Sequence, residues 1–173
     1  MLKKLKSLLF GKDATPSQPI AEGAPPIDVK VAVTNPSLVD AMNRLNTDQS
    51  SAAKTDLLLE LNKSNYLAAI FSDEMNMSEP DENGNKEIEK GSLIKVLNTS
   101  DSEGNIYLPL FTDWCAIKNY INKPVDTLVF SPQKAWSWAL SDYHGVVIYS
   151  EENSLPLNKS QIQYLASKVN KPT

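Results

Sequence analysis

The sequence predicts an α+β domain: a mixed β-sheet of about five strands with helices packed on it. Two observations support this fold. Two segments with helical spacing of apolar residues come first, and strand-like segments joined by a Gly-containing loop follow them. Helix-like and strand-like segments then alternate to the end. A hairpin followed by such alternation is typical of a mixed sheet. With 41% hydrophobic and 22% charged residues, the chain also has the composition of a globular domain.

Five segments have the apolar spacing and end signals of helices. Asn35-Pro36 and Ser131-Pro132 each place a capping residue before a proline, as at many helix starts. Asn158 is followed three residues later by Gln161, which is a capping-box pattern. We expect helices from Asn35 through Leu45, over Ser51–Asn62, from a Thr112 cap through Ile121, from Ser131 through Leu140, and from Asn158 through Val169.

Five apolar runs of strand length complete the expected fold: Tyr66–Phe71, Ser92–Leu97, Ile106–Phe111, Thr127–Phe130 and Val146–Tyr149. We expect the second and third to pair as a hairpin through the Gly-containing turn at 101–105. The third is apolar on both faces, which favours the sheet interior. Pro109 within it favours an edge or a bulge. The sequence leaves that conflict open.

The chain divides into three parts on composition. Residues 1–12 form a basic leader, residues 13–34 a flexible linker with several prolines, and residues 35–173 the α+β domain. On a helical wheel the leader's apolar residues fall within an arc of roughly 120°, with its lysines outside it. Such a helix can lie on an anionic membrane or enter a partner's groove. The alternative is that it docks on its own domain or stays disordered. The contacting residues would be Leu2, Lys3, Lys4, Leu5, Lys6 and Leu9.

Residues 52–167 resemble the N-terminal domain of the bacterial enhanced-serine-sensitivity protein, SseB. The resemblance rests on the leucine-rich 57–61 helix before a strand, on Leu-Pro-Leu-Phe-Thr at 108–112, on Pro-Gln-Lys-Ala-Trp at 132–136, and on Leu-Pro-Leu at 155–157. It implies an α+β fold and a non-enzymatic role in bacteria, and it supplies no catalytic motif. The further C-terminal domain of fuller members is not expected here.

Candidate catalytic and metal-binding residues are few. Cys115 and the single histidine, His144, have no spacing that would join them, and we expect a buried cysteine and a turn histidine. In the acidic segment 73–90, Asp81, Asn83 and Asn85 have the alternating spacing that opens a calcium loop, but Gly84 comes too early and Ser92 stands where a closing Glu is needed. We therefore expect no catalytic site, no cofactor and no metal. A solvated acidic loop is the favoured interpretation.

The charge and the aromatic residues guide the functional hypothesis. A net charge of −4 and the lack of a phosphate-binding glycine loop argue against nucleic acid and nucleotides. Trp136 and Trp138 stand two apart on one helix, so we expect one in the core and the other exposed as a contact anchor. We expect a bacterial, cytoplasmic protein-interaction module with an unknown protein partner. The alternative is a peripheral membrane protein recruited by its leader.

Overall fold

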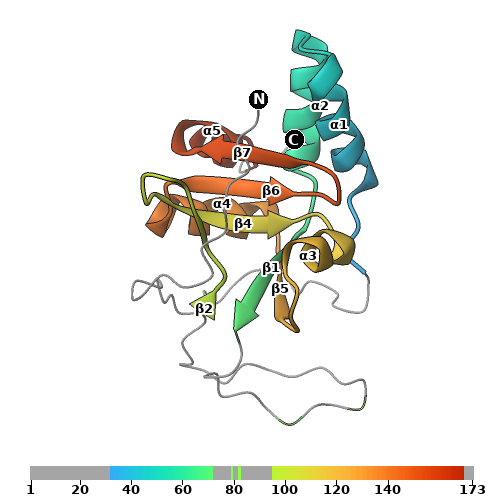
Figure 1. Ribbon diagram of the computed structural model, residues 1–173. Helices are drawn as coiled ribbons and strands as arrows, with labels where there is room; N and C mark the ends of the chain where they lie inside the picture. Colours follow the sequence, from blue (N-terminus) through green and yellow to red (C-terminus); the bar gives the residue numbers. More distant parts are fainter. Residues whose placement is uncertain (1–31, 72–78, 80–81, 83–94, 170–173) are drawn as a thin grey trace.

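A computed structural model describes residues 32–71, 79, 82 and 95–169 (Figure 1). Its helices and strands follow one another in the order α1 (Pro36–Thr47), α2 (Ser51–Leu61), β1 (Tyr66–Phe71), β2 (Lys95–Val96), β3 (Thr99–Ser100), β4 (Ile106–Phe111), α3 (Trp114–Tyr120), β5 (Asp126–Phe130), α4 (Pro132–Asp142), β6 (Gly145–Tyr149), β7 (Ser154–Asn158) and α5 (Lys159–Val169). The predicted α+β class is confirmed. The leader and most of the linker lie outside the described residues, as does nearly all of the acidic segment.

The strands form one mixed sheet. Its main path runs β2-β1-β4-β6-β7, while β5 pairs with β1 and β3 pairs with β4. The β4–β6 pair is parallel, with Tyr107 opposite Gly145 and Phe111 opposite Tyr149. The other pairs are antiparallel. The parallel pair is connected through α3, β5 and α4, which is the crossover that two parallel strands require.

Each face of the sheet carries its own apolar core. Alternate residues of β1 point to opposite faces, so Tyr66 and Ala68 join one core and Leu67 and Ala69 the other. The larger core holds the buried side chains of α1, α2, α4 and α5. The smaller core lies under α3 and includes Ile117. Figure 1 shows α3 in front of the sheet and α4 behind it.

The predicted hairpin is wrong in its first strand. The described part of the expected strand Ser92–Leu97 contains β2, whereas the strand that pairs with β4 is β3, which lies beyond Leu97. β2 pairs with β1, where Val96 lies opposite Ile70, and Leu97 N–H donates to the Ala69 carbonyl at 2.8 Å. β3 then pairs with β4. The hairpin is therefore β3–β4, and its loop begins at Asp101.

The position of Pro109 reconciles the two expectations about β4. On one edge β4 pairs with β6 from Tyr107 to Phe111. On the other edge it pairs with β3 at Ile106 and Tyr107 and with β1 at Phe111. Pro109 falls between these two short pairings, where the lack of an N–H is tolerated. The strand is therefore buried even though it contains a proline.

β7 is a further strand that was not among the five expected ones. It runs antiparallel to β6, with Pro156 opposite Val147. Ser150 N–H donates to the Asn153 carbonyl across the turn at 2.8 Å. Hydrogen-bonded and non-hydrogen-bonded pairs alternate along an antiparallel ladder. Counting from that turn, Pro156 falls at a non-hydrogen-bonded position, so its missing N–H lies on the outer edge and costs no ladder bond.

Capping explains most helix starts, with two corrections. Ser131 Oγ accepts from Lys134 N–H at 3.4 Å, and Asn158 and Gln161 exchange both bonds of a capping box at 3.0 and 2.9 Å. These predictions are confirmed. The cap of α3 is Asp113, whose carboxylate accepts from Ala116 N–H at 2.9 Å, and not Thr112. A carboxylate accepts more strongly than a hydroxyl.

Asn35 precedes α1 as expected, but its side chain does not cap that helix. Its amide nitrogen instead donates to the carbonyls of Asn65, at 2.8 Å, and Thr112, at 2.7 Å. Those two carbonyls lie just before β1 and just after β4. The Asn35 amide therefore joins the segment before α1 to the sheet. A residue that the sequence predicts as a helix cap makes tertiary hydrogen bonds instead.

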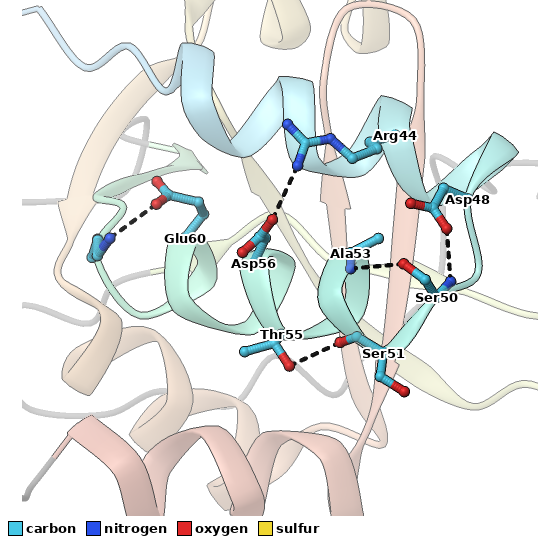
Figure 2. Close-up of polar contacts among 9 residues, drawn as sticks. Arg44, Asp48, Ser50, Ser51, Ala53, Thr55, Asp56 and Glu60 are labelled. Carbon is cyan, nitrogen blue, oxygen red and sulfur yellow. Dashed lines mark hydrogen bonds and ion pairs between the residues drawn. The ribbon is translucent and has the colours of Figure 1, made fainter.

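α1 and α2 form an antiparallel helical pair with polar contacts on its outer side (Figure 2). Ser50 caps α2 by accepting from Ala53 N–H at 3.2 Å, and Asp48 accepts from Ser50 N–H at 2.8 Å. Arg44 of α1 pairs with Asp56 of α2 at 3.0 Å. Both charged side chains are about half exposed, so the pair contributes at most about 1 kcal/mol. The turn geometry, rather than this ion pair, sets the direction of α2.

Candidate functional site

An apolar groove lies where α2, α5 and β7 meet, with one contribution from α1. Its volume is about 470 Å³. It is open to solvent, since Tyr164 at its rim is 50% exposed. The lining side chains are mostly leucines, with a few polar groups at the rim: Leu45, Lys54, Leu57, Leu58, Leu61, Leu155, Leu157, Ser160, Gln161, Tyr164 and Leu165.

The groove follows from an excess of apolar residues on α2. Leucines occupy four of the five positions from 57 to 61. A helix that is apolar round much of its surface must be covered on more than one side or leave apolar surface open. Leu57 and Leu61 are buried in the core, Leu58 is half-buried beside the groove, and Leu59 is 52% exposed. The neighbouring helices therefore cover only part of the apolar surface of α2.

A set of buried and partly buried hydrogen bonds joins the elements that form the groove. The indole nitrogen of Trp136 on α4 donates to Asn62 Oδ1 at 2.8 Å, and Asn62 Nδ2 donates to the Leu165 carbonyl at 3.1 Å. Tyr66 Oη donates to the Leu61 carbonyl at 2.7 Å. Burial raises the pKa of the Tyr66 phenol, so it stays a neutral donor. The end of α2 is thus fixed to α4, α5 and β1.

The outer edge of β7 is poorly suited to accept another strand. Pro156 has no N–H to offer on that edge. The next outward N–H is that of Asn158, and it donates to Gln161 Oε1 at 2.9 Å. Strand addition depends on a row of free N–H and C=O groups. Of the sites around β7, the groove is the one shaped to receive side chains.

The expectation that one of the two tryptophans is exposed is wrong. Trp136 is fully buried, but Trp138 is also buried, at 8% exposed. The two indoles do point in different directions: Trp136 packs on Tyr66 with ring centroids 5.6 Å apart, and Trp138 packs on Phe130 at 5.0 Å. Both indole rings are covered by neighbouring side chains, so neither tryptophan offers a contact surface to a partner. The tryptophan that is exposed is Trp114, at 43%.

Cys115 is exposed on α3 rather than buried as expected. His144 Nδ1 accepts from Ile106 N–H at 3.2 Å, and His144 N–H donates to the Ile106 carbonyl at 2.7 Å, as expected for a turn histidine. Cys115 follows the end of β4 and His144 lies beside its start. The intervening strand spans about 16 Å, at roughly 3.3 Å per residue. The structure therefore does not bring the two together.

Several predicted sites fall where the structure gives no description. The leader residues Leu2, Lys3, Lys4, Leu5, Lys6 and Leu9 lie outside the described residues, and so do Asp81, Asn83 and Asn85 of the acidic segment. Within the described ranges, no group of three or more His, Cys, Asp or Glu side chains could hold a metal ion. No helix among those same residues is long and apolar enough to cross a membrane.

Comparison with known families adds to this geometry. The model of the SseB protein N-terminal domain matches residues 38–163. The chain belongs to the SseB N-terminal domain family. The resemblance inferred from the sequence is confirmed, and the match begins earlier than expected, so that it includes most of α1. No curated protein and no solved structure matches the chain.

The SseB N-terminal region contains nearly all of the groove. The match begins at Leu38 in α1 and extends into α5 up to residue 163. It therefore includes the groove-lining residues of α1, α2 and β7 and the first turn of α5. Two further lining residues, Tyr164 and Leu165, follow directly after it. The groove is thus a feature of the SseB N-terminal fold of this chain and not of a separate appended segment.

Proposed function

We propose that this SseB N-terminal domain is a non-enzymatic protein-interaction module and that the α2/α5 groove is its binding surface. One observation carries the proposal: seven of the eleven groove-lining residues are leucines, and the groove is open to solvent. Open apolar surface of this kind marks contact sites, because leaving it in water is unfavourable. The partner's apolar side chains would fill the groove. We place this interaction in a bacterial cytoplasm, which the single cysteine also favours.

The shape of the site supports a helical partner. Recognition of a helix in a groove uses apolar side chains spaced along one helical face. Here α2 and α5 form two walls and the leucines of β7 form the floor. Recognition by strand addition would need an open sheet edge, and Pro156 together with the Asn158–Gln161 contact removes donors from the β7 edge. The groove is therefore better suited to an amphipathic helix than to an extended peptide.

Site-specific photo-crosslinking in living cells tests this function. A photoreactive residue at position 58, inside the groove, should capture a discrete protein, whereas the same residue at position 59 should not. Leu59 is the matched control, because it is a leucine on the same helix that points to solvent. Equal capture from both positions, or from neither, would contradict the proposal.

A second candidate function rests on the leader. Its apolar arc and its lysines at positions 3, 4 and 6 have the pattern of a helix that binds an anionic membrane surface. The linker would let it reach away from the domain. Flotation of the full-length chain and of a variant lacking residues 1–12 with anionic vesicles tests this function. Full-length protein that fails to float would contradict it.

A further inference from the structure

The charges around the groove are distributed unevenly. No acidic residue lines it, and its one charged lining residue is Lys54 on α2. A second lysine, Lys168, lies one turn beyond Tyr164 on α5, and its Nζ is 5.3 Å from the centre of the Tyr164 ring. That ring forms part of the rim. A lysine therefore stands on each of the two helical walls.

The acids of α2 point away from the groove. Lining residues 54, 57, 58 and 61 share one side of the helix, and positions 56 and 60 fall on the opposite side. Asp56 there pairs with Arg44 of α1, and Glu60 pairs with Lys63 (Figure 2). Glu151 and Glu152 lie in the β6–β7 turn, at the end of β7 that contributes Leu155. The acids of α2 and of the β6–β7 turn therefore do not stand among the groove-lining residues of either helical wall.

We propose that the groove binds an acidic amphipathic helix of a partner protein, with its apolar face in the groove and its carboxylates beside Lys54 and Lys168. This inference rests on the function proposed above and adds the chemistry of the partner. Charges across an interface favour partners of opposite sign and disfavour partners of like sign. The chain's own leader has three lysines within residues 1–6 and is therefore the disfavoured occupant.

Fluorescence anisotropy with three designed peptides tests the inference. Each has about 15 residues, enough for a marginal helix. The first places leucines on one face and glutamates on the other, the second replaces the glutamates with lysines, and the third scrambles the first. We expect the full-length chain to bind the acidic amphipathic peptide at least tenfold more tightly than either of the others. Added salt should reduce that preference.

Two pairs of variants show where binding occurs. Lys54→Glu with Lys168→Glu should weaken binding of the acidic peptide about tenfold, since each exposed charge pair contributes only modestly. Lys118→Glu with Lys123→Glu makes the same change in net charge within and just after α3, which covers the other face of the sheet, and should leave binding of the acidic peptide unchanged. Leu58→Asp should abolish binding, whereas Leu59→Asp should preserve it.

The outcomes separate this inference from the proposed function. Three results would overturn the inference. The basic peptide could bind as tightly as the acidic one or more tightly, or neither amphipathic peptide could bind. Alternatively, the Kd of the acidic peptide could stay unchanged in the variant with Lys54→Glu and Lys168→Glu. The crosslinking result at position 58 would still stand in each of those cases. Failure of that crosslinking, with the acidic peptide still bound in the groove, would instead contradict the cellular function.

Discussion

The indole N–H of Trp136 donates to Asn62 Oδ1 at 2.8 Å although Trp136 is fully buried. The Nδ2 of the same Asn62 amide donates to the Leu165 carbonyl. One side chain at the end of α2 therefore satisfies a buried donor on α4 and a carbonyl on α5. Leu165 lines the groove, and Asn62 directly follows Leu61, which also lines it. We therefore expect this asparagine to help hold α2 and α5 in place on either side of the groove.

Asn62→Ala should destabilise the domain by about 1–3 kcal/mol, because it leaves the buried indole N–H without a partner. Urea unfolding followed by tryptophan fluorescence measures this loss. Asn65→Ala, at an exposed position three residues along the chain, is the matched control and should stay within about 0.5 kcal/mol of wild type. Equal stability of the two variants would show that the Asn62 contacts contribute little.

Gly145→Ala should be more damaging than Gly104→Ala. A Cβ at position 145 would overlap the Leu157 carbonyl and lie 3.1 Å from two ring carbons of Tyr107, so the β6–β7 pair must separate. We expect a loss of about 3 kcal/mol, the upper end for overpacking, because the overlapping oxygen belongs to the backbone. At Gly104 there is open space, and the cost is the strain of its φ of 85°, about 1–2 kcal/mol. Thermal unfolding of both variants checks the order.

Asp101 links the β3–β4 turn to acid stability. Hydrogen bonds from Asn105, from the Glu103 N–H and from Tyr107 Oη hold the pKa of the Asp101 carboxyl below its usual range. A lowered folded-state pKa contributes stability above the unfolded value of about 3.9 and loses it as pH falls through the folded value. Asp101→Asn should therefore be less stable than wild type at neutral pH, and the difference should shrink as the pH falls below about 4. A difference that stays constant over that range would contradict this assignment.

Asn158→Ala removes one half of the α5 capping box. Gln161 N–H then loses its acceptor at the start of the helix. We expect a loss of about 1 kcal/mol, measured by urea unfolding. Asn158→Ser keeps a capping oxygen and should recover most of it. If the serine variant is no better than the alanine variant, the side-chain cap does not stabilise α5.

Local signals in the sequence predicted most of the helices. Ser131-Pro132 and the Asn158–Gln161 pair act within one helical turn, so their meaning does not depend on the rest of the fold. β7 was missed because Pro156 argues against a strand unless one knows that its nitrogen faces an outer edge. That knowledge requires the register with β6, which no local pattern contains.

Tertiary contacts decided the candidate site. The spacing of Trp136 and Trp138 correctly predicted that they point in different directions. Their burial depends on Tyr66 and Phe130, which come from other parts of the chain. The leucine run at 57–61 was the available signal for the groove, since it supplies more apolar surface than one face can bury. Which of those leucines remains exposed to solvent depends on where α5 and β7 pack against α2.

The most direct test of the central claim is to titrate the partner captured at position 58 against four folded proteins. These are the wild type, Leu58→Asp and Leu59→Asp, with Tyr164→Ser as a second groove variant because Tyr164 is half exposed and tolerates change. Calorimetry should show at least a tenfold weaker Kd, about 1.4 kcal/mol, for both groove variants and an unchanged Kd for Leu59→Asp. Groove variants that remain folded and bind as tightly as wild type would contradict the claim.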